Sequence, residues 1–252
     1  MQLQGKTALI TGSCGDGIGR STALRLAREG ANIVLNYGTH RRGPEMQARA
    51  KQIAAAIAEL GGRALIHEAD STDEAQVVAM VAAAQRAFGG VDILVNNAGG
   101  DWHIRDYTEI PFADWQAVLA AEVNGPFLLL KHTVPGMRAK GWGRVVHISM
   151  EGALRMAGMR GLAPDYCLGK AARAWMTQAF GPGELARGIT VNAVEPGIID
   201  HLSWEDALAA ARGPLPVSRT QATPADIAEV IAFLCSEAGR FVTTSAVCVT
   251  QP

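Results

Sequence analysis

A tyrosine and a lysine lie four residues apart in the stretch YCLGK, at Tyr166 and Lys170. On a helix, this spacing puts both side chains on one face, about one turn apart. A neighbouring ammonium group lowers the pKa of a phenol and prepares it to exchange a proton near neutral pH. The pair could therefore serve proton transfer. Helices also carry Tyr and Lys at this spacing by chance, so the surrounding elements must decide.

The composition is typical of one soluble globule. The chain has 252 residues, 48% hydrophobic and 19% charged, with a formal net charge of -1. We expect a single domain over residues 1–252 and no nucleic-acid partner. No apolar run approaches membrane-spanning length and no signal peptide is visible, so we expect a cytoplasmic protein with no membrane partner. The cysteines lack CxxC spacing and the histidines lack HExxH spacing, which predicts reduced thiols and no metal site.

Short apolar runs alternate with helical patterns along the chain. Near-continuous Val, Ile and Leu predict strands buried on both faces. These runs lie at residues 7–11, 32–36, 64–69, 92–97, 144–149 and 189–194, of which 64–69 is the most polar. The alternation predicts right-handed crossovers and hence an α/β fold, a doubly wound parallel sheet covered by helices on both faces. Residues 200–222 break the alternation, and we expect them to form a substrate lid.

A glycine-rich turn follows the first predicted strand and opens a helix. Its glycines are Gly12, Gly15, Gly17 and Gly19. Glycine lets backbone N–H groups approach a pyrophosphate closely, and the N-terminus of a helix favours negative charge. The turn therefore predicts a dinucleotide site.

The end of the second predicted strand bears on which dinucleotide binds. A carboxylate there would hold a ribose 2′-hydroxyl and repel a 2′-phosphate. The sequence has Asn36 instead, followed by a basic loop that contains Arg41 and Arg42. NADPH is therefore favoured over NADH, chiefly because the acid is missing.

From about Gly5 to Val249 the chain resembles the short-chain dehydrogenases/reductases, and it is similar to their 3-oxoacyl-acyl-carrier-protein reductase-like members. TGSCGDGIG looks like the TGxxxGxG turn of the family, and Asp70 resembles the acid that hydrogen-bonds the adenine amine. NNAG at 96–99 looks like the fourth-strand motif. YCLGK matches YxxxK, and VEPGI contains the PG turn beside the nicotinamide amide.

The resemblance implies a Rossmann-like fold in three layers, α/β/α, and hydride transfer between NAD(P) and a carbonyl or alcohol of a small molecule. It also implies a homo-oligomer, a tetramer or a dimer. Tyr166 would be the general acid, and Lys170 would lower its pKa and hold the nicotinamide ribose. The implied coenzyme-binding residues are Gly12, Ser13, Gly17, Ile18, Asn36, Arg41, Arg42, Asp70, Ser71, Asn97, Ala98, Gly99, Tyr166, Lys170, Pro196, Gly197 and Ile199.

Two departures concern the turn and the fourth helix. The glycine turn is one residue longer than the family pattern between Gly12 and Gly17. On the fourth helix, the family's asparagine, which supports a proton-relay water, falls on Glu122. Asn124 could substitute if the helix is distorted near Pro126, which lacks a backbone N–H. We favour Glu122 as the residue in that place.

The family's catalytic serine has two possible positions. Counting along the fifth strand puts it on Met150, whereas the SxxG pattern puts it on Ser149. A slip of one residue along a strand turns the side chain to the opposite face, so the two alignments predict different chemistry. We take Ser149 as the catalytic candidate, and the alternative is that Met150 lines the site.

Large apolar residues after the fourth, fifth and sixth strands predict a ring-containing or otherwise hydrophobic substrate. The substrate candidates are Trp102, Met150, Met156 and Trp204, with His103, Arg105, Glu151, Met159 and Leu202 as further lining residues. Two alternatives remain open. One is a changed reaction, motivated by Glu122 and Met150. The other is a protein that binds the coenzyme without turnover.

Overall fold

The computed structural model describes residues 1–38, 43–155, 163–213 and 221–250 of the chain. Four residues named above lie outside this part: Arg41, Arg42, Met156 and Met159.

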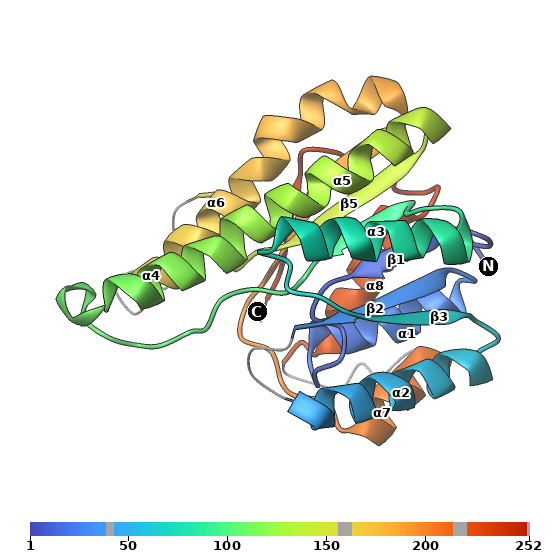
Figure 1. The fold of residues 1–252 in the computed structure, drawn as a ribbon, viewed down its shortest axis with the longest axis horizontal. Coiled ribbons are helices and arrows are strands. Elements are labelled where there is room, and N and C mark those ends of the chain that lie inside the picture. The colour runs from blue at the N-terminus through green and yellow to red at the C-terminus, as the bar shows by residue number, and fades with distance from the viewer. Residues whose placement is uncertain (39–42, 156–162, 214–220, 251–252) are drawn as a thin grey trace.

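Among the described residues, seven parallel strands form one sheet in the order β3-β2-β1-β4-β5-β6-β7 (Figure 1). The strands are β1 Thr7–Ile10, β2 Asn32–Tyr37, β3 Ala64–Glu68, β4 Ile93–Asn96, β5 Gly143–Ile148, β6 Ile189–Pro196 and β7 Ala246–Val249. The six predicted strands are thus confirmed. The polar run at 64–69 is the edge strand β3, which is partly exposed. The apolar pattern does not predict β7, the short strand at the opposite edge.

The helices connect the strands and cover both faces of the sheet. They are α1 Ile18–Arg28, α2 Gly43–Glu59, α3 Glu74–Phe88, α4 Phe112–Leu119, α5 Gly125–Lys140, α6 Pro164–Phe180, α7 Trp204–Arg212 and α8 Pro224–Cys235. A π-helical turn, Ala120–Asn124, joins α4 to α5. Short 3₁₀ turns occupy Tyr107–Glu109, Gly181–Gly183 and Leu185–Arg187.

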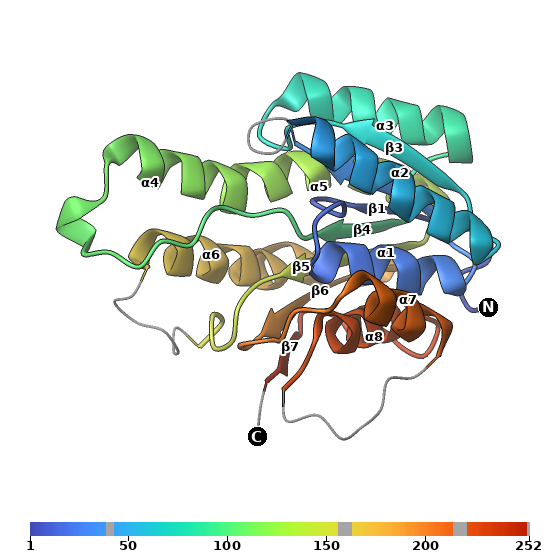
Figure 2. The ribbon, with the colours of Figure 1, turned by 90° about the horizontal axis from the view of Figure 1, so that it is seen from below.

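The core is divided between the two faces of the sheet, because successive strand residues point to opposite sides. Ala8 and Ile10 pack in one core with α1, α2, α7 and α8, and Figure 2 shows α7 and α8 beside α1. Leu9, between them, packs in a second core with α3 and α5. This arrangement is the three-layer α/β/α fold. Within the described part of the chain, no helix has both the length and the apolar character of a membrane span.

The strand order places the candidate site. The chain runs outward from β1 to β3 on one side and from β4 to β7 on the other, so its direction reverses between β1 and β4. At such a switch point a crevice opens outside the carboxyl ends of the strands, where ligands bind. The glycine turn follows β1 and the NNAG segment ends β4, so the two motifs meet at this crevice, where the coenzyme was expected to bind.

Part of the predicted lid, residues 200–222, is built into the fold. It contains α7, whose Ala207 and Ala211 are buried in the core shared with α1 and α8. His201, before this helix, lines the cleft at the switch point. Residues 214–220 lie outside the described part.

Candidate active site

A cleft of about 830 Å³ lies at the switch point. It is lined by the glycine turn after β1, the ends of β2 and β3, the segment after β4, and parts of α4 and the π-helical turn. The predicted coenzyme-binding residues in its lining are Gly12, Gly17, Asn36, Asp70, Ser71, Asn97, Ala98 and Gly99. Residues far apart in the sequence thus form one continuous groove.

The glycine turn has the close backbone packing that a phosphate cradle requires. Gly12 has φ +62°, and a Cβ atom on it would lie 3.1 Å from the Cα of Ala98. A Cβ on Gly19 would lie 2.6 Å from the carbonyl oxygen of Gly12. The first turn of α1 contains no acidic side chain, and no side chain caps its N-terminus at Gly17. Its N–H groups and the positive end of its dipole therefore suit an anionic pyrophosphate.

The end of β4 is tied to this turn by hydrogen bonds. Asn97 donates through Nδ2 to the carbonyl oxygens of Thr11 at 2.8 Å and Gly12 at 3.2 Å. The Thr11 hydroxyl accepts from the backbone N–H groups of Asn97 and Ala98, both at 3.0 Å. The NNAG segment therefore sets the width of the cleft.

Asn36 and Ser13 brace the turn against β2. The Asn36 side chain accepts from the N–H of Gly12 at 3.4 Å and donates to the carbonyl oxygen of Ala69 at 3.0 Å. The Ser13 hydroxyl accepts from the N–H of Asn36 at 3.0 Å. Sequence reasoning missed this bracing role of the Asn36 amide. No carboxylate takes the place of Asn36, so the end of β2 stays neutral at this position.

The long glycine turn carries an acid of its own. Asp16 lines the cleft, and its carboxylate forms ion pairs with Arg20 of α1 at 3.2 Å and with Arg49 of α2 at 2.6 Å. These pairs offset a charge that would otherwise repel a phosphate.

One face of α6 carries Tyr166, Lys170 and Arg173, which are four and three residues apart. The Lys170 ammonium lies 5.2 Å from the centroid of the Tyr166 ring. A Cβ on Gly99 of the cleft lining would lie 3.3 Å from Lys170 Nζ. The Trp102 ring lies 5.3 Å from the Tyr166 ring, centroid to centroid. The predicted proton-transfer pair is thus beside the cleft.

Glu122, in the π-helical turn, is fully buried and reaches the same point. Its Oε1 accepts from the N–H of Gly100 at 2.8 Å. Its Oε2 lies 3.3 Å from Lys170 Nζ and 2.9 Å from Nη2 of Arg173. Asn124 is exposed to solvent. Glu122 therefore faces Lys170, as favoured from the sequence.

Ser149 and Met150 point to different partners. The buried Ser149 hydroxyl donates to the carbonyl oxygen of Lys170 at 2.7 Å. Met150 packs in a small apolar cluster beside Tyr166. Ser149 therefore holds α6 against β5, and Met150 forms part of the wall next to the phenol.

The electrostatics differ from the sequence expectation for Tyr166. Burial raises the pKa of this phenol, the Glu122 carboxylate raises it further, and Arg173 opposes them. Burial and Glu122 together outweigh the opposing effect of Arg173, so the net pKa of Tyr166 is raised, and the lowering that was expected from Lys170 stays a prediction. Burial lowers the pKa of Lys170 to about 8, with Glu122 opposing and Arg173 adding to the shift.

Arg173 is the site residue that sequence reasoning missed. It is fully buried and contacts Glu122, and it lies seven residues after Tyr166. That spacing, two helical turns, puts it on the same face and was the signal available in the sequence.

The remaining predicted residues lie around this centre. Pro196 ends β6, and the N–H of Gly197, which follows it, donates to the carbonyl oxygen of Val249 at 3.0 Å. Ile18 and Ile199 pack against the core of α1, α7 and α8. Trp204 packs against that core too, with the Arg20 guanidinium 5.6 Å from its ring, and it is absent from the lining of the cleft.

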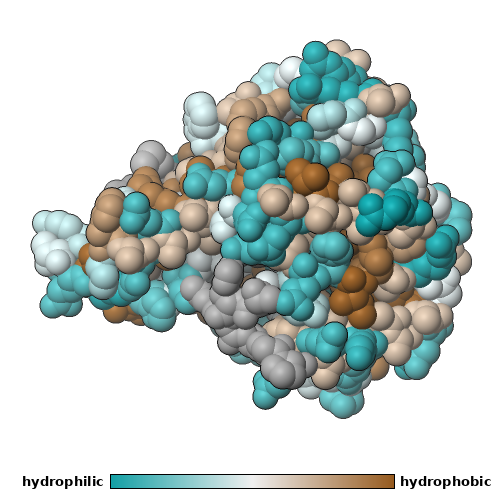
Figure 3. Space-filling view, viewed as in Figure 1, coloured by the Kyte–Doolittle hydropathy of each residue, from teal (hydrophilic) through white to brown (hydrophobic). Residues whose placement is uncertain are grey.

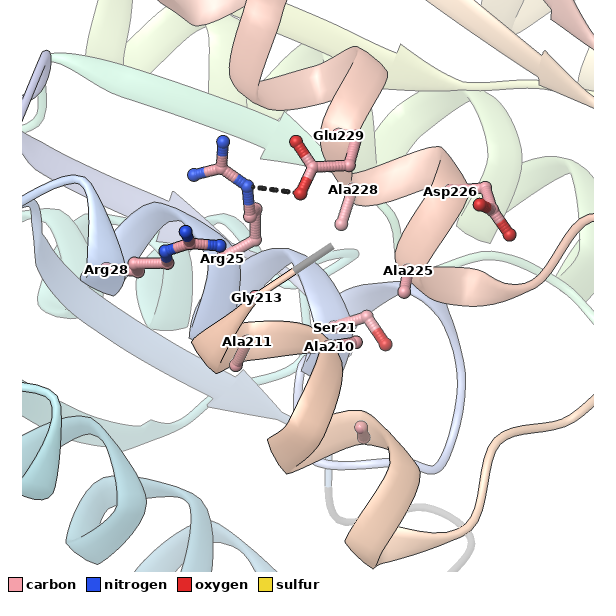
Figure 4. Close-up of a pocket in the computed structure, with 11 residues that line it drawn as sticks. Ser21, Arg25, Arg28, Ala210, Ala211, Gly213, Ala225, Asp226, Ala228 and Glu229 are labelled. Carbon is pink, nitrogen blue, oxygen red and sulfur yellow. Dashed lines mark hydrogen bonds and ion pairs between the residues drawn. The ribbon is translucent and has the colours of Figure 1, made fainter. Parts of the chain in front are cut away.

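A second cavity, of about 330 Å³, lies between α1, α7 and α8 (Figure 4). Alanines form much of its wall, and Arg25 there is hydrogen-bonded to Glu229 at 2.7 Å. It contains none of the predicted site residues.

Comparisons with known proteins agree with this geometry. A family model described as enoyl-(acyl carrier protein) reductase matches residues 13–251. Cis-4-hydroxycyclohexanecarboxylate dehydrogenase of Sinomonas cyclohexanicum is 34% identical over 242 residues, covering 94% of this chain and 92% of that protein. D-beta-hydroxybutyrate dehydrogenase of Cupriavidus necator is 32% identical over 256 residues, covering 95% and 94%. The crystal structure of a blue fluorescent protein from a metagenomic library, in complex with NADPH, matches with a TM-score of 0.82 at 32% identity, covering 99% of this chain and 98% of that one.

Proposed function

The chain belongs to the short-chain dehydrogenase/reductase family of NAD(P)-dependent oxidoreductases, and we propose that it reduces a carbonyl of a small hydrophobic molecule with NADPH, using Tyr166 as the general acid. The observation that carries the proposal is the position of the α6 face. Lys170 adjoins Gly99 in the wall of the cleft, and Tyr166 adjoins Lys170. The proton donor therefore lies beside the groove that contains the coenzyme cradle.

The side chains have separate roles in this proposal. When bound, the dinucleotide supplies the hydride. Tyr166 donates a proton to the carbonyl oxygen, and its raised pKa keeps the phenol protonated at neutral pH. Lys170, held by the carbonyl oxygen of Ile148 at 3.1 Å, binds the nicotinamide ribose. Trp102 and Met150 form an apolar wall beside the phenol, which suits a ring-containing substrate.

Three observations support NADPH as the coenzyme. The end of β2 has Asn36 in place of an acid, so nothing at that position repels a 2′-phosphate. The NADPH complex of the structural neighbour adds an independent reason. Arg41 and Arg42 supply positive charge in the sequence just after this strand. We expect NADPH to bind more tightly than NADH.

The test uses purified protein, NADPH or NADH, and a panel of cyclic ketones. Tyr166→Phe should lower kcat/KM by about 10²- to 10⁴-fold, the usual contribution of a positioned general acid, and leave the dissociation constant of NADPH unchanged. Tyr107→Phe makes the same chemical change at a side chain that is 73% exposed, and it should leave turnover unchanged. Undiminished turnover in Tyr166→Phe would refute the role of the phenol, and tighter binding of NADH would refute the coenzyme preference.

A changed reaction on the same coenzyme is the second candidate. It is favoured by the Ser149 hydroxyl, which bonds to the backbone of Lys170, while Met150 lies beside Tyr166. Neither of these two residues then offers a free hydroxyl proton to orient the substrate oxygen, and the phenol of Tyr166 must do so alone. Coenzyme-dependent turnover that survives Tyr166→Phe would favour this candidate.

We also propose that copies of the chain associate through the outer faces of α5 and α6. Figure 3 shows hydrophobic surface along the arm that α4, α5 and α6 form. The large apolar side chains exposed on these two helices are Phe127, Leu168, Trp175 and Phe180. Their burial between subunits would remove apolar area from water.

A further inference from the structure

The π-helical turn leaves two backbone carbonyls without a helical partner. The N–H of Gly125 donates to the carbonyl oxygen of Ala120, five residues back, and therefore does not reach that of Ala121. Pro126 has no N–H, so the carbonyl oxygen of Glu122 has no donor four residues on. Buried carbonyls without a donor are costly, so another group must satisfy them.

Arg173 satisfies both carbonyls. Its Nε donates to the carbonyl oxygen of Glu122 at 3.2 Å, and its Nη2 donates to that of Ala121 at 3.0 Å. The guanidinium also joins the strand ends that form the site. Nη2 donates to Ala98 at 2.7 Å, and Nη1 donates to Asn96 at 3.2 Å and to Ile148 at 3.3 Å, each at the carbonyl oxygen. One buried side chain thus connects β4, β5 and the turn that carries Glu122.

The contact between Arg173 and Glu122 is mainly electrostatic. The two protons of Nη2 go to carbonyl oxygens, and Oε2 of Glu122, 2.9 Å from Nη2, has no hydrogen bond of good geometry. The same oxygen lies 3.3 Å from Lys170 Nζ. The buried cluster therefore holds one carboxylate, that of Glu122, between two cations, those of Lys170 and Arg173. Two buried cations placed so close need an anion between them.

We propose that Arg173 is a positioning residue whose charge offsets that of Glu122, so that the pair takes the place of the neutral family asparagine and Lys170 stays the uncompensated cation among the described residues of the site. The consequence for turnover rests on the proposed function, but the charge balance itself does not. The titratable groups facing the cluster are Tyr166, Cys167 and Lys170 of α6, Glu122 of the π-helical turn and His147 of β5.

The proposal predicts opposite effects of two neutralising substitutions. Glu122→Gln removes an anion that favours the charged ammonium, so the pKa of Lys170 should fall below its wild-type value of about 8. Arg173→Met removes a cation that disfavours it, so the pKa of Lys170 should rise. Each shift should be about one pH unit, the size that a neighbouring charge usually produces. The double variant should return close to the wild-type midpoint.

The experiment is an NMR titration of ¹³C-lysine-labelled protein, with the Cε resonance of Lys170 assigned by its absence in Lys170→Met. It needs no turnover, so it decides the charge balance even if the proposed reduction fails. Arg173→Lys keeps the charge without the full set of donors. The midpoint of Lys170 in this variant should stay within about a third of a pH unit of the wild-type value. Arg144→Met removes another buried arginine, at the opposite end of β5, and should leave the midpoint unchanged.

Shifts in opposite directions that cancel in the double variant support the proposal. Equal midpoints in all variants would make Arg173 only a structural brace, and shifts of one sign would also overturn it. If Arg173→Met does not fold, the neutral double variant still decides, since its midpoint must lie above that of Glu122→Gln. If the enzyme is active, kcat/KM of each variant is expressed relative to the wild type. The relative kcat/KM of the double variant should exceed the product of the two single-variant values by at least about 10-fold.

Discussion

His147 shows how a residue beside the site is kept neutral by its surroundings. It is fully buried on β5, and its Nδ1 lies 3.2 Å from Nδ2 of Asn96, so the neutral ring accepts a hydrogen bond there and carries its proton on Nε2. Burial, with a smaller contribution from Arg173, lowers the pKa of His147 to about 3. The buried ring of His147 therefore stays neutral at ordinary pH.

This neutrality predicts acid sensitivity. The unfolded chain binds a proton at His147 near pH 6.5, and the folded chain binds it only near pH 3, so stability from this residue is complete above pH 6.5 and falls as the pH decreases towards 3. The loss should be about 2 kcal/mol at pH 5. His147→Gln keeps an acceptor for Asn96 but does not titrate, so urea unfolding curves from pH 5 to 7 should show a flatter pH dependence.

The matched control is His103→Gln, at an imidazole that is 61% exposed. This variant should keep the wild-type pH dependence of the unfolding free energy. If His147→Gln kept that dependence too, the acid sensitivity would come from other groups.

Spacing in the sequence was enough to find Tyr166 and Lys170 on one helix face and to favour Glu122. It could not find the contacts of Arg173, because most of its partners are backbone carbonyls from segments far away in the chain. The direction of the pKa shift of Tyr166 could not be predicted from the sequence either, since it is decided by the burial of the phenol. The choice between Ser149 and Met150 needed the strand face, which a motif does not fix.

At the scale of elements, the entry of α1 depends on the absence of a side chain at Gly19. A Cβ there would lie 2.6 Å from the carbonyl oxygen of Gly12 and 2.7 Å from Nδ2 of Asn97. These are backbone and tightly bonded atoms, so the helix would have to move. The turn between β1 and α1 would then lose its fit to a pyrophosphate.

Gly19→Ala should therefore weaken NADPH binding by about 10-fold or more, since a shifted cradle misplaces several N–H donors at once. Fluorescence titration with NADPH measures the dissociation constant. Gly136→Ala, in α5 where an added Cβ meets nothing, should leave the constant unchanged and raise stability by about 0.5–1 kcal/mol. An unaltered dissociation constant of NADPH in Gly19→Ala would show that the turn is not part of the coenzyme site.

The elements themselves were largely readable. Pro126 predicted the disturbance of a long helix, which the structure resolves into α4, a π-helical turn and α5. The pattern could not say that a π-helical turn forms, because that depends on Arg173 reaching the released carbonyls. The weak signals at the two sheet edges have different causes: β3 is partly exposed and carries polar residues, whereas β7 is apolar but only four residues long.

At the scale of the whole molecule, α4 and the adjoining ends of α5 and α6 project beyond the sheet (Figure 1). Trp175 on α6 is 63% exposed, and the proposed association of copies would cover it. Light scattering after gel filtration should give a multiple of 26.5 kDa for the wild type and a smaller mass for Trp175→Glu. A wild-type mass of one chain at micromolar concentration would contradict the association.

The strand order explains why function could be inferred at this scale. Alternating strands and helices predicted a doubly wound sheet, and in such sheets the ligand site follows from the reversal between β1 and β4. The identity of the substrate does not follow from topology, because it depends on the side chains around Trp102 and Tyr166.

The most direct measurement uses NADPH deuterated at the transferable C4 position, with a cyclic ketone that the wild type reduces. The account predicts deuterium on the carbinol carbon of the alcohol, seen by mass spectrometry and NMR, with the product nearly absent for Tyr166→Phe at equal coenzyme saturation. Alcohol formed without deuterium on that carbon, or deuterated alcohol formed at the wild-type rate by Tyr166→Phe, would contradict it.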